Sequence, residues 1–181
     1  AVTSEQRGRA KSTSYAIFYG AGPGKLVEEL AVELDDAKQM IEDWHAAFPT
    51  VKGWTERVAA GCAVDGFVTT INGRKRYLHG IRSRNDAEKR KARRQASNTV
   101  CQGSAADLIK MAMLRIQDRI KADGWPATML LQVHDELVFD LHVSEMDSVP
   151  PKIERAMREA LPVDLPIEVE MGTGRDWLEA H

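Results

Sequence analysis

Residues 130–140 read Leu-Leu-Gln-Val-His-Asp-Glu-Leu-Val-Phe-Asp, and this stretch decides the fold class. The apolar runs on either side of His134, Asp135 and Glu136 predict a tight antiparallel hairpin with these polar residues at its tip. Aspartate is common in turns, so the pair of carboxylates has an ordinary structural interpretation. Neighbouring carboxylates also repel each other, which a divalent cation relieves, and two-metal phosphoryl-transfer sites hold ions about 3.5–4 Å apart with such groups. Oxygen ligands of this kind suit Mg²⁺.

The sequence around this hairpin is mainly helical. The longest helical pattern covers residues 86–122, with a possible break at Gly103. After the hairpin we expect a helix over about 146–161 and a proline-bounded strand over 167–171.

The first third of the chain also favours helices. A helix is expected from Thr3, which can cap it, to Tyr19, although residues 14–19 alone would equally suit a strand. Further expected elements are a short helix over 23–31 and an amphipathic helix from Asp35 that Pro49 interrupts. Another helix is expected through Trp54, Val58 and Cys62 to about Val64, followed by a hairpin around Asn72-Gly73. The expected fold class is therefore α/β, with the sheet portion antiparallel.

Four residues at steps of four form a first candidate binding set: Arg7, Lys11, Tyr15 and Tyr19. On a helix they share one face over about 18 Å. Cationic groups can hold a triphosphate, and an aromatic ring one turn further can stack on a base or sugar. The alternative is a solvated helix end that runs into a buried aromatic end.

A second set with the same spacing comprises Arg94, Asn98 and Gln102. Amides and a guanidinium on one helix face can donate to minor-groove acceptors that every base pair presents, and so sense the shape of a pair. A plain polar helix face is the alternative interpretation.

Charge and cysteine content set broad limits. The net charge of −2 gives no global basic signature, so nucleic-acid binding would rely on local runs at residues 74–76 and 89–94. Cys62 and Cys101 lack metal-ligand spacing and favour a reducing compartment. No apolar run approaches the roughly 20 residues that cross a bilayer, so we expect a soluble chain.

Three segments together resemble DNA polymerases of family A, in that family's order. They are Arg7-x-x-x-Lys11-x-x-x-Tyr15-x-x-x-Tyr19-Gly20, the run from Arg94 to Asp107, and Gln132-Val133-His134-Asp135-Glu136-Leu137-Val138. The likeness extends to residues 65–78 and to Gly174-Arg175-Asp176-Trp177, and so covers essentially the whole chain. The resemblance implies a helical fingers subdomain over 1–84, with the nucleotide-binding helix, and a C-terminal part of an antiparallel-sheet polymerase palm over 85–181.

The resemblance also implies residue roles. Arg7 and Lys11 would contact the triphosphate of a deoxynucleotide, Tyr15 would stack beside its sugar, and Tyr19 would lie at the templating position. Primer-template DNA would meet Arg94, Asn98 and Gln102, with His134 at the primer terminus. Asp135 would bind a catalytic Mg²⁺ with Glu136 close by, and the complete enzyme would use two such ions.

One feature of the family is missing from these 181 residues. The other metal-binding aspartate lies upstream of the fingers helix, so we expect this polypeptide alone to be inactive and to need upstream thumb and palm segments of a parent chain. Tyr15, residues 103–107 and residues 66–81 most resemble eukaryotic polymerase theta or nu. A theta-like parent would act in the nucleus and a bacterial parent in the cytoplasm. A role in DNA repair or replication is expected.

Three other functions compete with this interpretation. A P-loop at Gly20 to Lys25 fails because the spacing is one residue short and Leu26 stands where Ser or Thr is needed. A metal hydrolase built on His134 and Asp135 lacks other ligands at metal-binding spacing. A non-catalytic DNA-binding or interaction module stays open, because an incomplete active site can still bind.

Overall fold

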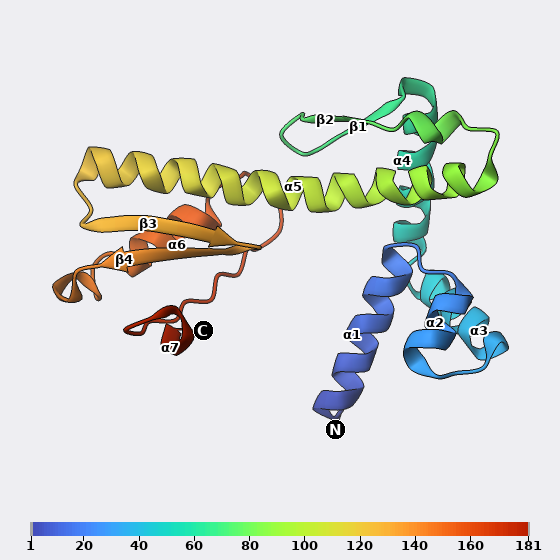
Figure 1. Cartoon of the computed structure of the whole chain (residues 1–181), viewed down its shortest axis with the longest axis horizontal. Helices are drawn as coiled ribbons and strands as arrows, with labels where there is room; N and C mark the ends of the chain where they lie inside the picture. Colours follow the sequence, from blue (N-terminus) through green and yellow to red (C-terminus); the bar gives the residue numbers. More distant parts are fainter. Residues whose placement is uncertain (1, 181) are drawn as a thin grey trace. The chain divides into compact units, whose positions relative to one another are not determined.

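The computed structural model describes residues 2–180, which form two compact units (Figure 1). One unit ends at Gln102 and the other begins at Gly103, within the long helix α5 (Asp86–Asp123). The first unit also holds α1 (Ser4–Phe18), α2 (Pro23–Leu30), α3 (Leu34–Ala47), α4 (Pro49–Asp65), β1 (Phe67–Thr69), β2 (Lys75–Tyr77) and the 3-10 helix η1 (His79–Arg82). The second also holds β3 (Ala127–Val133), β4 (Glu136–Leu141), the 3-10 helix η2 (Val143–Glu145), α6 (Pro150–Arg158) and α7 (Trp177–Ala180). The predicted subdomain boundary between residues 84 and 85 stays a prediction.

Helix α1 begins with a reciprocal cap. Thr3 Oγ1 accepts a hydrogen bond from the Gln6 backbone N–H at 3.2 Å, and Gln6 Oε1 accepts one from the Thr3 N–H at 2.9 Å. The helix ends at Phe18, close to the predicted end. The helical prediction is confirmed, and the alternative of a strand over residues 14–19 is wrong.

Three buried side chains join the first helices. Ile17 of α1, Leu26 of α2 and Ala37 of α3 form one apolar cluster, and Leu26 is fully buried. Phe18 adds a stacked contact with Trp54 of α4, with the ring centroids 6.3 Å apart. Only the last turn of α1 is anchored in this way, because Ile17 is its one buried residue among those described.

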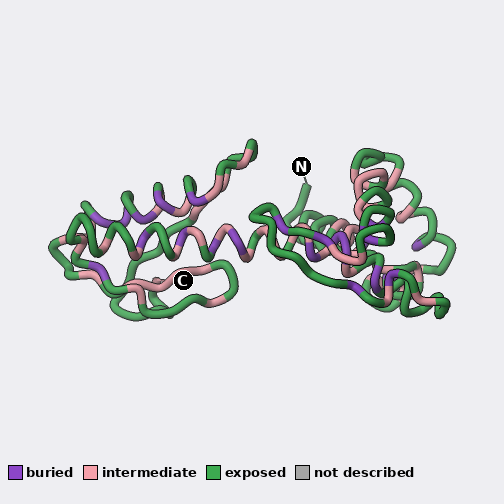
Figure 2. Tube along the Cα trace, turned by 90° about the horizontal axis from the view of Figure 1, so that it is seen from above, coloured by how far each residue is buried: buried purple, intermediate pink, exposed green. Residues whose placement is uncertain are grey.

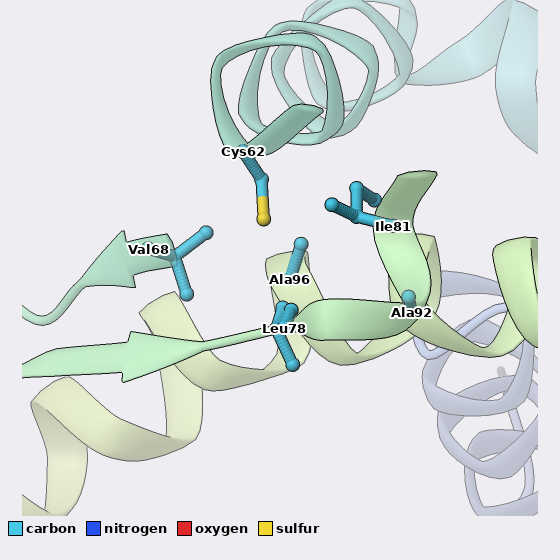
Figure 3. Packing of buried hydrophobic residues seen from close by; sticks show 6 residues of the cluster. All are labelled: Cys62, Val68, Leu78, Ile81, Ala92 and Ala96. Atoms are coloured by element: carbon cyan, nitrogen blue, oxygen red, sulfur yellow. The ribbon is translucent and has the colours of Figure 1, made fainter. Parts of the chain in front are cut away.

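A second cluster holds the first part of α5 against α4 and the β1–β2 hairpin (Figure 3). Its buried members are Cys62, Val68, Leu78, Ile81, Ala92 and Ala96. The side chain of Arg82 reinforces this packing, because its guanidinium donates to the carbonyl of Ala63 at 2.7 Å and to that of Val64, at the end of α4. The part of α5 that carries Ala92 and Ala96 is thereby held within the first unit.

The two sheets are antiparallel hairpins. Strand β1 pairs with β2 around Asn72-Gly73, as predicted, with Phe67 opposite Tyr77. Strand β3 pairs with β4 from Ala127 opposite Leu141 to Val133 opposite Glu136. The register shifts between Met129 and Leu131, which identifies a β-bulge at this point of β3.

The second unit packs around the later part of α5. Ile116 of α5, Ala127 of β3 and three residues around α6 (Val149, Ile153 and Ala156) form its buried core. Purple segments in Figure 2 mark these buried positions, whereas much of β3 is exposed. The β3–β4 hairpin is therefore covered on one side only within the described residues.

Three expectations about elements need correction. Helix α5 continues through Gly103 without a break, because one glycine costs only about 1 kcal/mol and both parts of the helix are packed. The last long helix begins at Pro150 rather than near 146, since proline fits the first turn of a helix. Residues 167–171 form no strand. The strands of residues 2–180 form two two-stranded sheets, and residues 167–171 pair with neither of them.

A helix that is both long and apolar enough to cross a membrane is absent from residues 2–180.

Candidate functional site

The structure places the first candidate set on one face of α1. The ammonium of Lys11 lies 5.9 Å from the centroid of the Tyr15 ring, which is a cation–π distance. The ring of Tyr15 stacks on that of Tyr19 at 6.4 Å and an interplanar angle of 27°. Arg7 is exposed one turn before Lys11. The predicted continuous face of two cations followed by two aromatic rings is confirmed, while its ligand stays a prediction.

Exposure weakens the alternative of a buried aromatic end. Tyr15 is 54% exposed and Tyr19 is half-buried, whereas Ile17, which is 4% exposed, makes the core contact. The aromatic rings therefore lie beside the anchoring residue rather than in the core. A large exposed ring next to an ammonium group is available for stacking on a planar ligand.

The second candidate set lies on the first part of α5. Arg94 and Gln102 are exposed and Asn98 between them is half-buried. Within the described residues, Oδ1 of Asn98 is buried and accepts no hydrogen bond. Because a buried acceptor without a donor is costly, a donor supplied by a ligand would stabilise this position.

Arg76, in one of the predicted phosphate-binding runs, has a structural partner. The guanidinium of Arg76 donates to the hydroxyl of Thr99 at 2.8 Å, and that hydroxyl donates to the Gln95 carbonyl at 2.6 Å. Strand β2 is therefore tied to α5 beside Asn98. Sequence reasoning missed this contact because the two residues are 23 positions apart and no local pattern indicates that they meet.

The tip of the β3–β4 hairpin is tighter than predicted. Val133 pairs with Glu136, so only His134 and Asp135 form the turn and Glu136 is the first residue of β4. His134 adopts φ +52°, an uncommon conformation for a residue other than glycine, and its carbonyl accepts a hydrogen bond from the Gln132 side chain at 2.7 Å. Such backbone strain often accompanies a functional site.

The carboxylates at this tip differ in exposure. Asp135 is exposed in the turn and Glu136 is half-buried at the start of β4. Across residues 2–180, no group of three or more histidine, cysteine, aspartate or glutamate side chains is arranged to hold a metal ion. Carboxylate oxygens are donors of the kind that suits Mg²⁺.

A cavity of about 220 Å³ lies beside the end of α1. Its lining includes Phe18, Gly20, Trp44, His45 and Arg94. Within the described residues, Nε1 of Trp44 and Nδ1 of His45 are buried without hydrogen-bond partners. A cavity of this size, with Trp44 and His45 in its lining, can hold ordered water that would satisfy them.

A helix with a cationic and aromatic face, a polar face on α5 and a hairpin tipped by carboxylates are the features that the resemblance to family A DNA polymerases predicted. The model of "DNA polymerase family A" matches residues 1–179. The chain belongs to this family.

Comparisons with individual proteins agree. The chain is 38% identical over 179 residues to the thermostable DNA polymerase I of Thermus filiformis, which covers 99% of this chain and 21% of that protein. It is 37% identical over 176 residues to DNA polymerase I of Mycobacterium leprae, covering 97% of this chain and 19% of that protein. This chain thus spans about a fifth of the length of these relatives.

A solved structure is similar in three dimensions. The POL domain of Pol1 from M. smegmatis, in complex with DNA primer-template and dNTP, has a TM-score of 0.94 and 37% sequence identity to this chain. The similarity covers 99% of this chain and 32% of that one. The expected mixture of helices and small antiparallel sheets in a polymerase fold is confirmed.

Proposed function

We propose that this chain forms the fingers and the C-terminal palm portion of a template-directed DNA polymerase. The observation that carries the proposal is the exposed face of α1, where Lys11, Tyr15 and Tyr19 follow one another in contact. Family membership supports the reaction class. In that reaction the primer 3′-hydroxyl attacks the α-phosphate of a deoxynucleoside triphosphate, the new phosphodiester bond forms, and pyrophosphate leaves.

The α1 face would bind the incoming nucleotide. Arg7 and Lys11 would hold the negatively charged phosphates, and Tyr15 would stack beside the sugar. Tyr19 would lie at the templating position. The order of these groups along the helix supports the assignment, because charge lies at one end and aromatic surface at the other.

The α5 face and the hairpin turn would bind primer-template DNA. Arg94, Asn98 and Gln102 would donate to minor-groove acceptors, and His134 would contact the primer terminus. Exposed basic residues in the runs 74–76 and 89–94 would add phosphate contacts that weaken with salt.

Family A polymerases depend on divalent metal ions. Asp135 and Glu136 would hold Mg²⁺ through carboxylate oxygens, with Asp135 exposed in its turn. Two Mg²⁺ ions in the complete enzyme would neutralise charge on the attacking and leaving oxygens. The chain's own contribution is to project these oxygens from a short, paired hairpin.

We expect these 181 residues alone not to polymerise. Among the described residues, no third carboxylate joins Asp135 and Glu136, and a two-metal site needs carboxylates from separate elements. Upstream thumb and palm segments of the same parent chain would supply the missing aspartate and cover the exposed side of β3. Leu130 and Leu131 on that strand are 57% and 45% exposed, which supports such a neighbour.

A primer-extension assay tests the proposal with Mg²⁺ and the four deoxynucleotides. A longer polymerase that includes these residues should extend a primer, and its Asp135→Asn variant should lose incorporation while DNA binding is largely retained. The 181-residue chain should give no extension. Robust extension by this chain that disappears in Asp135→Asn would reject the need for an upstream aspartate.

The alternative function is a non-catalytic DNA-binding or interaction module. It predicts that Asp135→Asn changes nothing measurable, because no metal is held. The narrower subgroup also stays a proposal: a theta-like or nu-like parent rests on Tyr15, residues 103–107 and residues 66–81, whereas the relatives described above are bacterial enzymes. A repair role and a nuclear rather than cytoplasmic location depend on that subgroup.

A further inference from the structure

Helix α5 approaches the end of α1 at a glycine. Gly20 follows α1 at φ +83°, and the turn closes when the Ala21 N–H donates to the Ala16 carbonyl at 2.8 Å. A Cβ atom on Gly20 would lie 2.5 Å from Cδ and 2.7 Å from Cγ of Arg94, and 3.7 Å from its Cβ. The stem of Arg94 therefore lies on the Gly20 backbone, in space that any other side chain would occupy.

An added methyl group at Gly20 would force one of the two partners to move. The end of α1 is held by its closing hydrogen bonds and by Ile17, which is 4% exposed. The side chain of Arg94 is exposed and its Cγ and Cδ can rotate. The stem of Arg94 should therefore yield, and the guanidinium beyond Cδ would move with it.

We propose that Gly20 is a positioning residue for the Arg94 guanidinium. The lack of a side chain at Gly20 sets where this guanidinium lies on the face that Arg94 shares with Asn98 and Gln102. The inference rests on the proposed function of that face, which is donation to minor-groove acceptors of primer-template DNA. The contact of Gly20 with Arg94 would link the proposed nucleotide-binding helix to the proposed DNA-binding face. The spacing of residues within either helix does not predict this link.

The test uses the 181-residue chain and two primer-template duplexes, measured by fluorescence anisotropy. In the second duplex, 3-deazaadenine replaces adenine near the primer terminus, which removes the minor-groove N3 acceptor. The readout is the ratio of the two Kd values, which does not change if a variant is only partly folded. One lost hydrogen bond to a charged donor should give the wild-type chain a ratio of roughly tenfold. Gly20→Ala and Arg94→Ala should both bring it close to one.

Gly66→Ala is the matched control. Gly66 closes α4 at φ +82°, and the nearest atom to an added Cβ is Nη2 of Arg82 at 3.9 Å, an ordinary contact. Gly66→Ala has the same left-handed backbone strain as Gly20→Ala but lacks the clash. The strain alone should raise the unfolding constant by roughly 5–30-fold. This variant should keep the wild-type ratio of Kd values.

A double variant keeps the inference testable if Gly20→Ala does not fold. Arg94→Ala removes Cγ and Cδ and leaves Cβ at an ordinary distance, so Gly20→Ala in that background should destabilise the chain no more than Gly66→Ala does. A larger loss there overturns the inference, as does a wild-type ratio in Gly20→Ala. A ratio of one in the wild-type chain instead overturns the DNA-facing role of Arg94, and with it the proposed function of this face.

Discussion

Replacement of Ile17 by alanine should detach α1 from the first unit. Ile17 is 4% exposed and is the one buried residue of α1 among those described. Removal of a buried isoleucine side chain costs about 2–5 kcal/mol, and the better helix propensity of alanine returns only about 0.4 kcal/mol. What then holds α1 is mainly the stacked contact of Phe18 with Trp54, worth roughly 0.5–1.5 kcal/mol.

Hydrogen exchange measured by mass spectrometry checks this expectation. Because the loss is local, amides of α1 should exchange faster by roughly 15–2000-fold, while amides around Ile116 in the second unit keep their protection. Val64→Ala is a suitable control, since Val64 is 76% exposed and should change little. Equal loss of protection in both units, or none in α1, would refute the idea that Ile17 is the anchor.

Three further predictions concern binding and pH. In a longer polymerase that contains these residues, Lys11→Ala should lower kcat/KM for deoxynucleotides by roughly 10–100-fold through the lost phosphate contact, and unchanged steady-state kinetics would count against it. Tyr15→Phe should increase discrimination against dideoxynucleotides, by up to about tenfold, if the hydroxyl compensates for a missing sugar 3′-hydroxyl; the ratio of dideoxy to deoxy incorporation is the measurement. Burial, and secondarily the charge of Asp65, raises the pKa of the Cys62 thiol above 9.0. The folded state then keeps a proton that the unfolded state releases, so between pH 8 and 10 the wild-type chain should lose more stability than Cys62→Ala, as urea midpoints would reveal.

Local patterns sufficed to predict most elements. The capping pair Thr3 and Gln6, the proline that opens α4 and the Asn72-Gly73 turn are short-range signals, and each element begins or turns there. The same holds for the two candidate faces, because a four-residue step on a helix places side chains together whatever the rest of the fold does. The predicted strand over 167–171 failed because a strand also needs a partner, which no local pattern supplies.

Contacts between distant residues were beyond sequence reasoning. Arg76 belongs to a basic run, and only the fold shows that its guanidinium meets the Thr99 hydroxyl. The close approach of Arg94 to Gly20 is similar, since the glycine alone indicated just the end of a helix. Long-range packing decides which of several cations in a run stays available for a ligand.

The placement of Asp135 depends on more than its own hairpin. A two-stranded hairpin is marginally stable by itself, and here α5 and α6 support β3 and β4 through Ile116 and Ile153. The other side of β3 exposes Leu130 next to the bulge in its register. Burial of that side by an upstream strand would remove apolar surface from water and fix the turn that carries Asp135. If the same neighbour also supplied the missing carboxylate of the proposed metal site, affinity for Mg²⁺ and stability of the hairpin should rise together.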